Sequence, residues 1–407
     1  MDLIRLYGSA ANAQKQQARL DEMHARFDAL FGAGEAPIVI SAPGRTEIGG
    51  NHTDHNHGCV LAASVDMDTL CLARANGTNS VTLYSDMYDA PFTVDVSSLE
   101  PRADEKETTQ SLVRGVAAAL KQRGMDICGF DAYVTSTVQR GSGLSSSAAF
   151  EVMLVKTMSC LFGGDAIAAQ DNAVISQWVE NTYFMKPCGL MDQMASAVGG
   201  LVYIDFKNSP AQVESVQYDF AARGFGACVV SAGGDHGNLT ADYAAIPSEM
   251  KAAARVLGGQ TLRDVEDKIE GGIALMKGKV PDRAILRALH FADENARVKC
   301  MVKALKDDDL PAFLNNVILS GESSWKLLQN LYVPGSDNQE MPLALEMSRR
   351  FLQGKGAWRI HGGGFAGTIL AFVPLEDMDA YTACMESVFG KGAVKPLYIR
   401  PVGAVRL

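Results

Sequence analysis

The stretch Gly141-Ser142-Gly143-Leu144-Ser145-Ser146-Ser147-Ala148-Ala149 lies between a predicted strand at 130–138 and a predicted helix at 146–161. Its two glycines let the backbone approach a ligand closely, and its serines present hydroxyl and amide groups at the helix N-terminus, where the helix dipole favours anions. The stretch therefore predicts a phosphate cradle. It lacks the lysine of the Gly-x-x-x-x-Gly-Lys-Ser/Thr loop, so it is not a P-loop of that type. A serine-rich helix cap is the alternative interpretation.

The composition of the whole chain limits the classes of protein to which it can belong. The 407 residues include 37 Lys and Arg against 47 Asp and Glu, a net charge of −10, with 47% hydrophobic and 21% charged residues. These proportions exclude disordered, collagen-like and coiled-coil chains. The acidic balance argues against a nucleic-acid or anionic-membrane binder, because such partners require a basic face. An anionic substrate must therefore be bound by local features such as the cradle.

The sequence also predicts where the protein works. No apolar run approaches the roughly 20 residues that a membrane-spanning helix needs, and the polar start contains no signal-peptide apolar region. The eight cysteines form no Cys-x-x-Cys pair, which is not the pattern of a disulfide framework. We therefore expect reduced thiols and a cytoplasmic location.

Strands and helices interleave along the whole chain, which favours two α+β domains. A polar, proline-containing turn at 207–210 places the boundary between domains 1–206 and 207–407. Helices are expected over 10–31, 108–122, 146–161, 166–184, 239–256, 283–305, 310–330 and 376–389. Strands are expected near 38–40, 69–72, 81–84, 92–96, 130–138, 201–206, 227–231, 357–361, 368–373 and 397–400.

A second segment, APGRTEIGGNHTDHNHG at 42–58, combines short polar side chains with glycines. This pattern predicts a tight hydrogen-bonding loop suited to the hydroxyl groups of a small polar ligand. A metal site is an alternative, since His52, Asp54, His55 and His57 all have ligand chemistry. Residues one and two apart in an extended loop point in different directions, however, and no partner cluster occurs elsewhere. A plain polar turn is the third interpretation.

Two acidic residues and a glycine-rich segment complete the candidate set. Phosphoryl transfer needs an anionic Mg²⁺ ligand and a group that orients or deprotonates the attacking hydroxyl; Glu180 and Asp192 have the chemistry for these roles, although solvated surface acids are the alternative. Segment 361–368 contains Gly-x-Gly-x-x-Gly, but a strand follows it instead of a helix, which excludes a dinucleotide fingerprint. It is either a close-packed glycine loop or a plain turn.

Together, these segments resemble the GHMP kinase superfamily and, within it, the galactokinase family. Segments 43–45 (PGR) and 50–54 (GNHTD) are similar to the galactokinase signature loop, and 143–149 resembles the superfamily's phosphate-binding motif. Segment 188–193 (CGLMDQ) resembles one characteristic of galactokinases, and 362–367 resembles the superfamily's third motif. These matches follow the family's order over most of the chain.

This resemblance implies an α+β, two-domain GHMP kinase fold, with a ribosomal S5 domain 2-like N-terminal domain and a ferredoxin-like C-terminal domain. The site would lie in the cleft between them. The implied reaction is transfer of the ATP γ-phosphate to the C1 hydroxyl of α-D-galactose, with Mg²⁺ as cofactor. The partners are then ATP and a free hexose, without nucleic acid or membrane, in a monomer or weak oligomer.

The resemblance also assigns roles to individual residues. Asp192 matches the catalytic aspartate, and Arg45 matches the arginine beside it that stabilises developing charge. Ser147 and Glu180 match the Mg²⁺ ligands. The implied sugar-binding set is Asn51, His52, Thr53, Asp54, Asp192 and Tyr243, and the implied phosphate-binding set is Gly141, Ser142, Gly143, Leu144, Ser145, Ser146 and Ser147.

This chain departs from the family pattern at three places. It carries Asn51 where the family usually has glutamate and His55 where an aromatic residue is usual, and the segment 244–247 after Tyr243 lacks the usual arginines. An amide donates as well as accepts hydrogen bonds, unlike a carboxylate, so the preferred hydroxyl pattern can differ. A kinase for another hexose, such as N-acetylgalactosamine, and a non-catalytic sugar and ATP sensor are the alternatives.

Overall fold

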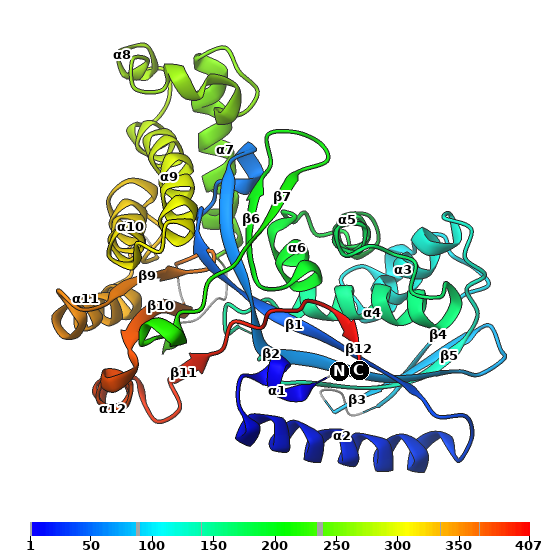
Figure 1. Cartoon of the computed structure of the whole chain (residues 1–407). Coiled ribbons are helices and arrows are strands. Elements are labelled where there is room, and N and C mark those ends of the chain that lie inside the picture. Colours follow the sequence, from blue (N-terminus) through cyan, green and yellow to red (C-terminus); the bar gives the residue numbers. More distant parts are fainter. Residues whose placement is uncertain (1, 87–89, 140, 234–238, 334, 366) are drawn as a thin grey trace.

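The computed structural model describes residues 2–86, 90–139, 141–233, 239–333, 335–365 and 367–407, which form two β-sheets and the helices around them (Figure 1). The strands are β1 (Ile38–Gly49), β2 (Cys59–Ala75), β3 (Ser80–Ser85), β4 (Phe92–Asp95), β5 (Phe130–Ser136), β6 (Leu201–Asp205), β7 (Gln212–Val216), β8 (Phe225–Gly233), β9 (Ala357–His361), β10 (Gly367–Pro374), β11 (Val394–Leu397) and β12 (Val405–Arg406). The helices are α1 (Leu3–Tyr7), α2 (Ala10–Phe31), α3 (Thr109–Lys121), α4 (Ser146–Phe162), α5 (Ala169–Val179), α6 (Met191–Val198), α7 (Thr240–Val256), α8 (Ile273–Met276), α9 (Asp282–Lys306), α10 (Leu310–Ser323), α11 (Glu340–Leu352) and α12 (Met378–Phe389).

The first sheet contains eight strands within the described part of the chain. Its main order is β12-β1-β2-β5-β3-β4, and β6 and β7 extend it beside the beginning of β2. Only the β3–β5 pair is parallel among the described pairings. The long strand β2 pairs with β6 through its first residues and with β5 through its last ones. One strand therefore joins the two parts of the sheet.

The two faces of this sheet are covered by different helices. Side chains alternate between the faces of a strand, so Cys71 and Ala73 enter the core under α3 and α4, whereas Leu70 and Leu72 pack against α2. Figure 1 shows α2 running along one face, with α3, α4, α5 and α6 on the other. The long α2 is stabilised by this contact, since an isolated helix with one apolar stripe is marginal in water.

The second sheet has the order β11-β8-β10-β9 and is antiparallel. One face packs against α11 and α12. The other face, through Phe372 and Leu370, meets α10 and continues into a core shared with the first sheet, which includes Ile48 and Leu61. The shared core holds the two sheets together and places the end of β1 beside the loop between β9 and β10.

Beyond residue 206, two segments pair with the first sheet. Strand β7 pairs with β6, and β12 pairs with β1. Between β11 and β12, Arg400 is fully buried and donates hydrogen bonds to the Ser41 hydroxyl (2.7 Å) and to the Gly403 carbonyl (3.0 Å). The division into domains 1–206 and 207–407 stays a proposal.

Most helices expected from the sequence are confirmed, among them 10–31, 146–161 and 283–305. The helices expected over 166–184 and 310–330 each end in a π-helical turn, at Glu180–Phe184 and Ser324–Leu328, a feature that is often found at functional sites. The α+β class is confirmed by the two mixed layers.

Two expectations about elements were wrong, and some elements, such as α6 and α11, were not expected. Residues 42–49 were expected within a tight loop, but they continue β1, because they pair with β2 through bulges near Pro43 and Glu47. The strand expected at 397–400 lies at 394–397. Helix α11 was not expected at all, although its buried residues Met341, Leu345, Ser348 and Leu352 recur at helical spacing.

Candidate active site

The predicted phosphate cradle forms the turn between β5 and α4. Ser145 precedes the helix in the left-handed conformation (φ 59°) and makes no side-chain cap; its hydroxyl instead donates to Asp192 Oδ2 (2.5 Å). The amide groups of the first turn of α4 are therefore not capped by a serine side chain, and they remain suited to an anion. This geometry contradicts the interpretation of the segment as a serine cap.

Close packing explains why the cradle needs a glycine at 143. Gly143 has φ +72°, and a Cβ atom there would lie 2.6 Å from Thr368 Oγ1 and 2.7 Å from His361 Nδ1. The second sheet thus approaches the cradle at a distance that only glycine allows. Leu144 is fully buried and its carbonyl accepts from the Arg45 amide (2.9 Å), so it anchors the cradle to β1. Ser142 donates to the Gln139 carbonyl (2.6 Å).

Arg45 and Asp192 form a bidentate ion pair. Arg45 Nε lies 2.7 Å from Asp192 Oδ1, and Arg45 Nη2 lies 2.7 Å from Asp192 Oδ2. Arg45 also donates from Nη1 to the Gly143 carbonyl, and its side chain is only 8% exposed, against 30% for Asp192. The pair therefore ties β1, the cradle and the first turn of α6 together, with the aspartate on the accessible side.

Asp192 opens onto a polar cavity of about 280 Å³. Its wall brings together residues from distant segments of the chain. They are Arg45, Glu47, Asn51, His52, Asp54, His55, Ser147, Glu180, Lys186, Cys188, Gly189, Met191, Asp192, Gln193, Gly362 and Gly363. Thus all but two of the predicted catalytic, sugar-binding and metal-binding residues line one cavity.

The two exceptions are Thr53 and Tyr243. Thr53 is fully buried, and its hydroxyl lies 2.9 Å from the Gly50 carbonyl and 2.7 Å from the Cys59 carbonyl. Thr53 therefore links the two ends of the 50–58 loop on its buried side. Tyr243 on α7 donates to the Gly364 carbonyl (2.7 Å) and lines an adjoining cavity of about 370 Å³. The 361–368 segment therefore lies between Tyr243 and Asp192; its Ala366 lies outside the described residues.

The histidines of the 50–58 loop form a chain of hydrogen bonds. His52 Nε2 donates to the Gly363 carbonyl (2.8 Å), His52 Nδ1 lies 3.3 Å from His55 Nε2, and His55 Nδ1 accepts from Asn56 (2.9 Å). Burial lowers the pKa of both His52 and His55. Because every nitrogen of these two rings is engaged, neither ring has a nitrogen left for a metal ion.

Asp54 is the acidic residue of this loop. Burial, with smaller contributions from Asp192 and Glu47, raises the pKa of Asp54 to about 6. Its Oδ1 accepts from the His55 amide (2.9 Å). A Cβ at Gly189 would lie 1.9 Å from Asp54 Oδ2, so the segment before α6 can pass beside this carboxylate only as glycine.

A buried acidic pair lies behind Asp192. Gln193 Nε2 donates to Glu180 Oε2 (2.9 Å) and to Glu151 Oε2 (3.1 Å), whereas its Oε1 is buried without a partner. Burial raises the pKa of both glutamates, and the charge of Glu180 adds to the effect on Glu151. Two like charges at such a site favour an added cation or proton.

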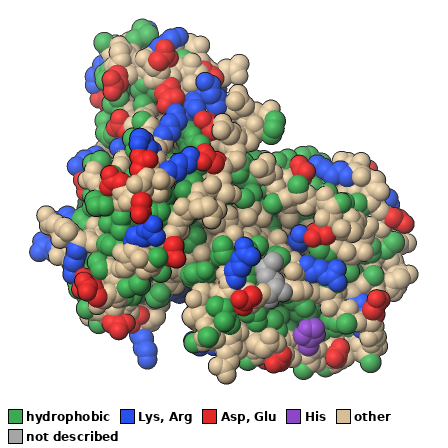
Figure 2. Space-filling view, viewed as in Figure 1, with side chains coloured by type: hydrophobic (Ala, Val, Ile, Leu, Met, Phe, Trp, Pro, Cys, Tyr) green, Lys and Arg blue, Asp and Glu red, His purple; other side chains and the backbone are tan. Residues whose placement is uncertain are grey.

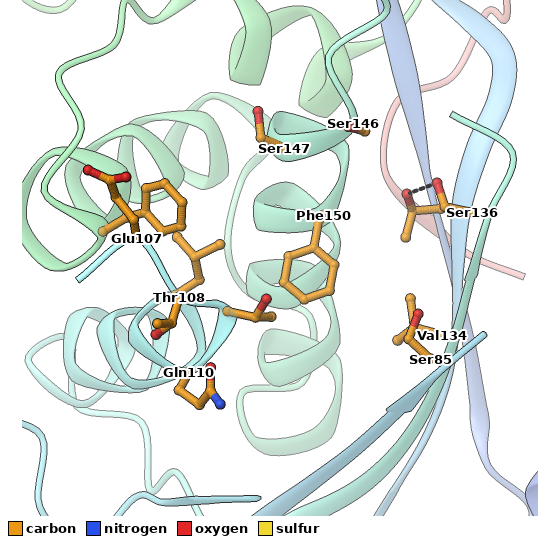
Figure 3. A pocket seen from close by; sticks show the side chains of 13 residues that line it. Ser85, Glu107, Thr108, Gln110, Val134, Ser136, Ser146, Ser147 and Phe150 are labelled. Atoms are coloured by element: carbon orange, nitrogen blue, oxygen red, sulfur yellow. Dashed lines mark hydrogen bonds between the residues drawn. The ribbon is translucent and has the colours of Figure 1, made fainter. Parts of the chain in front are cut away.

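A larger cavity, of about 530 Å³, adjoins the cradle on the side of α3 (Figure 3). In Figure 3, Ser146 and Ser147 stand at the top of α4 above Phe150, with Thr108 and Gln110 on the neighbouring helix and Val134 on the sheet. Apolar atoms form most of its lining, including those of Leu112, Val134 and Phe184. The cavity thus begins at the cradle and offers room for a flat apolar group.

Charge is mixed over the surface. On the face shown in Figure 2, acidic and basic side chains alternate over both lobes without a continuous basic patch. No helix in the described ranges has both the length and the apolar character that crossing a bilayer requires. This face therefore offers an anionic ligand no continuous basic surface, and the cradle with its neighbours is the described feature suited to bind one.

Sequence reasoning missed four residues of this site. Glu47 was not singled out, because 42–49 was taken as a loop. Glu151 lies within a helical segment that carries no pattern of its own, and Gln193 ends the CGLMDQ segment, in which the resemblance gave a role only to Asp192. Lys395, on β11, donates to Gln139 and lines a small cavity with Gly141 and Ser142. Its position beside the cradle arises from the pairing of β11 with β8, which no motif indicates.

Comparison with known proteins agrees with this geometry. Residues 111–200 match the family model described as the GHMP kinases N terminal domain. The solved structure of Lactococcus lactis galactokinase complexed with galactose has a similar fold, with a TM-score of 0.83 at 22% identity over 95% of this chain and all of that one. The cradle, the cleft and the two sheets therefore define a GHMP kinase.

Sequence similarity narrows the class further. Residues 25–75 match the galactokinase galactose-binding signature. The chain is 30% identical to the galactokinase of Streptomyces coelicolor over 91% of this chain and 93% of that one. It is 31% identical to the galactokinase of Glaesserella parasuis over 87% and 90%. The chain belongs to the galactokinase family.

Proposed function

We propose that this protein transfers the γ-phosphate of ATP to the C1 hydroxyl of α-D-galactose, giving galactose 1-phosphate and ADP. The observation that carries the proposal is the Arg45–Asp192 pair at the junction of the cradle and the polar cavity. Ser147 lines both cavities. A phosphate on the cradle and a hydroxyl beside Asp192 would therefore face each other.

Asp192 accepts the proton of the C1 hydroxyl. Arg45 and Ser145 together occupy three acceptor positions of the Asp192 carboxylate, two on Oδ2 and one on Oδ1. A carboxylate has about four such positions, so the one left is on Oδ1. As the C1 oxygen bonds to the γ-phosphorus and the bond to the β–γ bridging oxygen breaks, the proton passes to Oδ1 and ADP departs.

The nucleotide binds along the cradle. The uncapped first turn of α4 supports the phosphates, and the 530 Å³ cavity accepts the adenine base against Phe150 and Val134. Arg45 stabilises the charge that develops on the transferred group, because its guanidinium already donates to both the cradle and Asp192. The nearby basic side chain of Lys186 lines the same cavity as Asp192.

The site is chemically suited to Mg²⁺. Ser147 and Glu180 both line the polar cavity and offer the oxygen ligands that Mg²⁺ prefers. No group of three or more His, Cys, Asp or Glu among the described residues is arranged to hold a metal ion by itself, and few protein ligands are typical where phosphates and water supply the rest. Bound there, the ion would offset the charge of the β- and γ-phosphates.

A panel of free sugars tests the reaction. ADP release is measured with ATP, Mg²⁺ and each of galactose, N-acetylgalactosamine, glucose and mannose, and phosphorus NMR identifies the position of the phosphate. Galactose should be the preferred acceptor, with phosphate at C1. A preference for N-acetylgalactosamine would identify that sugar as the substrate instead of galactose. The absence of any sugar phosphate would favour a non-catalytic sensor of sugar and ATP.

We also propose a cytoplasmic location and a monomer or weak oligomer. All eight cysteines are unpaired, which suits a reducing compartment. The cavities described above are built from a single chain, so the proposed reaction requires no second copy.

A further inference from the structure

Glu47 is a buried carboxylate in the wall of the polar cavity. It lies near the end of β1, and its side chain is only 5% exposed. Arg359, itself fully buried, donates from Nη2 to Glu47 Oε1 (2.8 Å) and from Nη1 to the Glu47 carbonyl (3.0 Å). Asn51 Nδ2 donates to the same Oε1 (3.0 Å). The carboxylate is therefore held rigidly through one of its two oxygens.

The second oxygen of Glu47 is available for a ligand. No described residue donates a hydrogen bond to Oε2, whereas Oε1 receives two donors. An ionised carboxylate oxygen in a partly enclosed site requires a donor, and a ligand hydroxyl group can supply it. Glu47 also contributes to the raised pKa of Asp54, which places its charge near that side of the cavity.

Asn51, in contrast, has no free donor. One N–H of its amide is used by Glu47 and the other by the Gly362 carbonyl (2.8 Å). Its Oδ1 accepts from Asn330 (2.9 Å), with Ser324 at 3.4 Å. Asn51 therefore fixes the positions of Glu47 and the glycine loop, although it occupies the position where related sequences usually carry glutamate.

We propose that Glu47 is the specificity-determining carboxylate of the sugar site, whose Oε2 accepts a hydrogen bond from a hydroxyl of the bound hexose other than the C1 hydroxyl. This inference rests on the proposed sugar kinase function. Asp192 takes the C1 hydroxyl, and Glu47 belongs to a separate network with Arg359 and Asn51. The carboxylate that related sequences carry at 51 is thus supplied from position 47 in this chain.

The test combines Glu47→Gln with deoxygalactoses. The glutamine oxygen should stay with Arg359, so that an NH₂ group replaces Oε2 and can no longer accept. We expect kcat/KM for galactose to fall about 10- to 100-fold, the range for losing a hydrogen bond to a charged group, with KM for ATP nearly unchanged. One analogue among the 2-, 3-, 4- and 6-deoxy sugars should be used equally well by wild type and variant.

The matched control is Asp205→Asn. Asp205 also pairs with a largely buried arginine, Arg263 (2.8 Å), but does not line the cavity. The Asp205→Asn variant should have a lower thermal stability than the wild type, but the same ranking of kcat/KM among the deoxy sugars. Should Glu47→Gln fail to fold because Arg359 is left unpaired, the double variant Glu47→Gln with Arg359→Met removes that buried charge and is judged by the same criterion.

Two failures are distinguishable. A wild-type protein without turnover of any hexose would refute the proposed function. An active wild type, in which Glu47→Gln or the double variant lowers kcat/KM equally for galactose and every deoxy sugar, would refute the role of Glu47 alone. The equality of wild type and variant on one particular deoxy sugar is a readout that a purely structural role would not produce.

Discussion

Replacing Asp192 by asparagine tests the centre of the proposed mechanism. The amide has nearly the same volume, but it removes the basic carboxylate. Its NH₂ group faces a donor of Arg45 whichever oxygen it replaces, and it also faces the Ser145 hydroxyl when it replaces Oδ2. Loss of a general base lowers turnover by about 10² to 10⁴-fold. This range corresponds to about 3 to 5 kcal/mol in the activation barrier, at 1.36 kcal/mol for each factor of ten.

The assay is ADP release at saturating galactose and MgATP, with kcat and KM determined separately. Calorimetric titration with galactose and thermal unfolding show whether the variant still folds and binds. Asp205→Asn serves again as the control and should retain its kcat. A folded Asp192→Asn protein whose kcat lies within about threefold of the wild type would refute the assignment of the general base.

Three further perturbations have expected outcomes. Gly143→Ala should raise KM for ATP by at least about tenfold, since its Cβ would overlap Thr368. Gly77→Ala, away from the cradle, is the control, because φ there is also positive (+71°) and a Cβ meets nothing within 4 Å. Asp54→Asn should stabilise the free protein by at most about 3 kcal/mol at pH 8, where a carboxyl with a raised pKa of about 6 is ionised at a cost. In urea unfolding at pH 5 this gain in the free energy of unfolding should be smaller, because Asp54 of the wild type is then protonated. The Asp54→Asn variant should also bind galactose more weakly than the wild type does. His290 on α9 is fully buried, with ring nitrogens 2.8 Å from the Ser323 hydroxyl and 2.9 Å from the Asn51 carbonyl, and burial lowers its pKa to about 4. The free energy of unfolding should therefore be unaffected by this group above about pH 6.5 and should fall as the pH drops from about 6.5 to 4, because the unfolded state takes up the proton first. His290→Gln should flatten this part of the stability profile.

Local signals predicted part of the fold correctly. The α2 helix follows from the spacing of Leu20, Met23 and Phe27, which lie on one face and are buried, and the cradle follows from its glycines and serines before α4. Both depend on neighbours along the chain, so they are visible in the sequence. The resemblance to a known family added the pairing of Arg45 with Asp192, which are 147 residues apart.

Long-range contacts account for what the sequence did not predict. Residues 42–49 contain glycine and proline, which suggested a loop, yet pairing with β2 keeps them extended. That error concealed Glu47, because the alternation of a strand, not the order of a motif, directs it into the cavity wall. The use of Asn51 as a support depends on donors and acceptors from Gly362 and Asn330, which no local pattern contains.

The return of the chain to its first sheet affects how the cleft can move. The polypeptide passes from the first sheet to the second between β7 and β8, and goes back between β11 and β12. Two covalent connections allow one sheet to tilt against the other about the line that joins the connections. They oppose twisting and sliding of one sheet relative to the other. Arg400 fixes the second connection to β1 through its hydrogen bond to Ser41, and the core that the two sheets share opposes their separation.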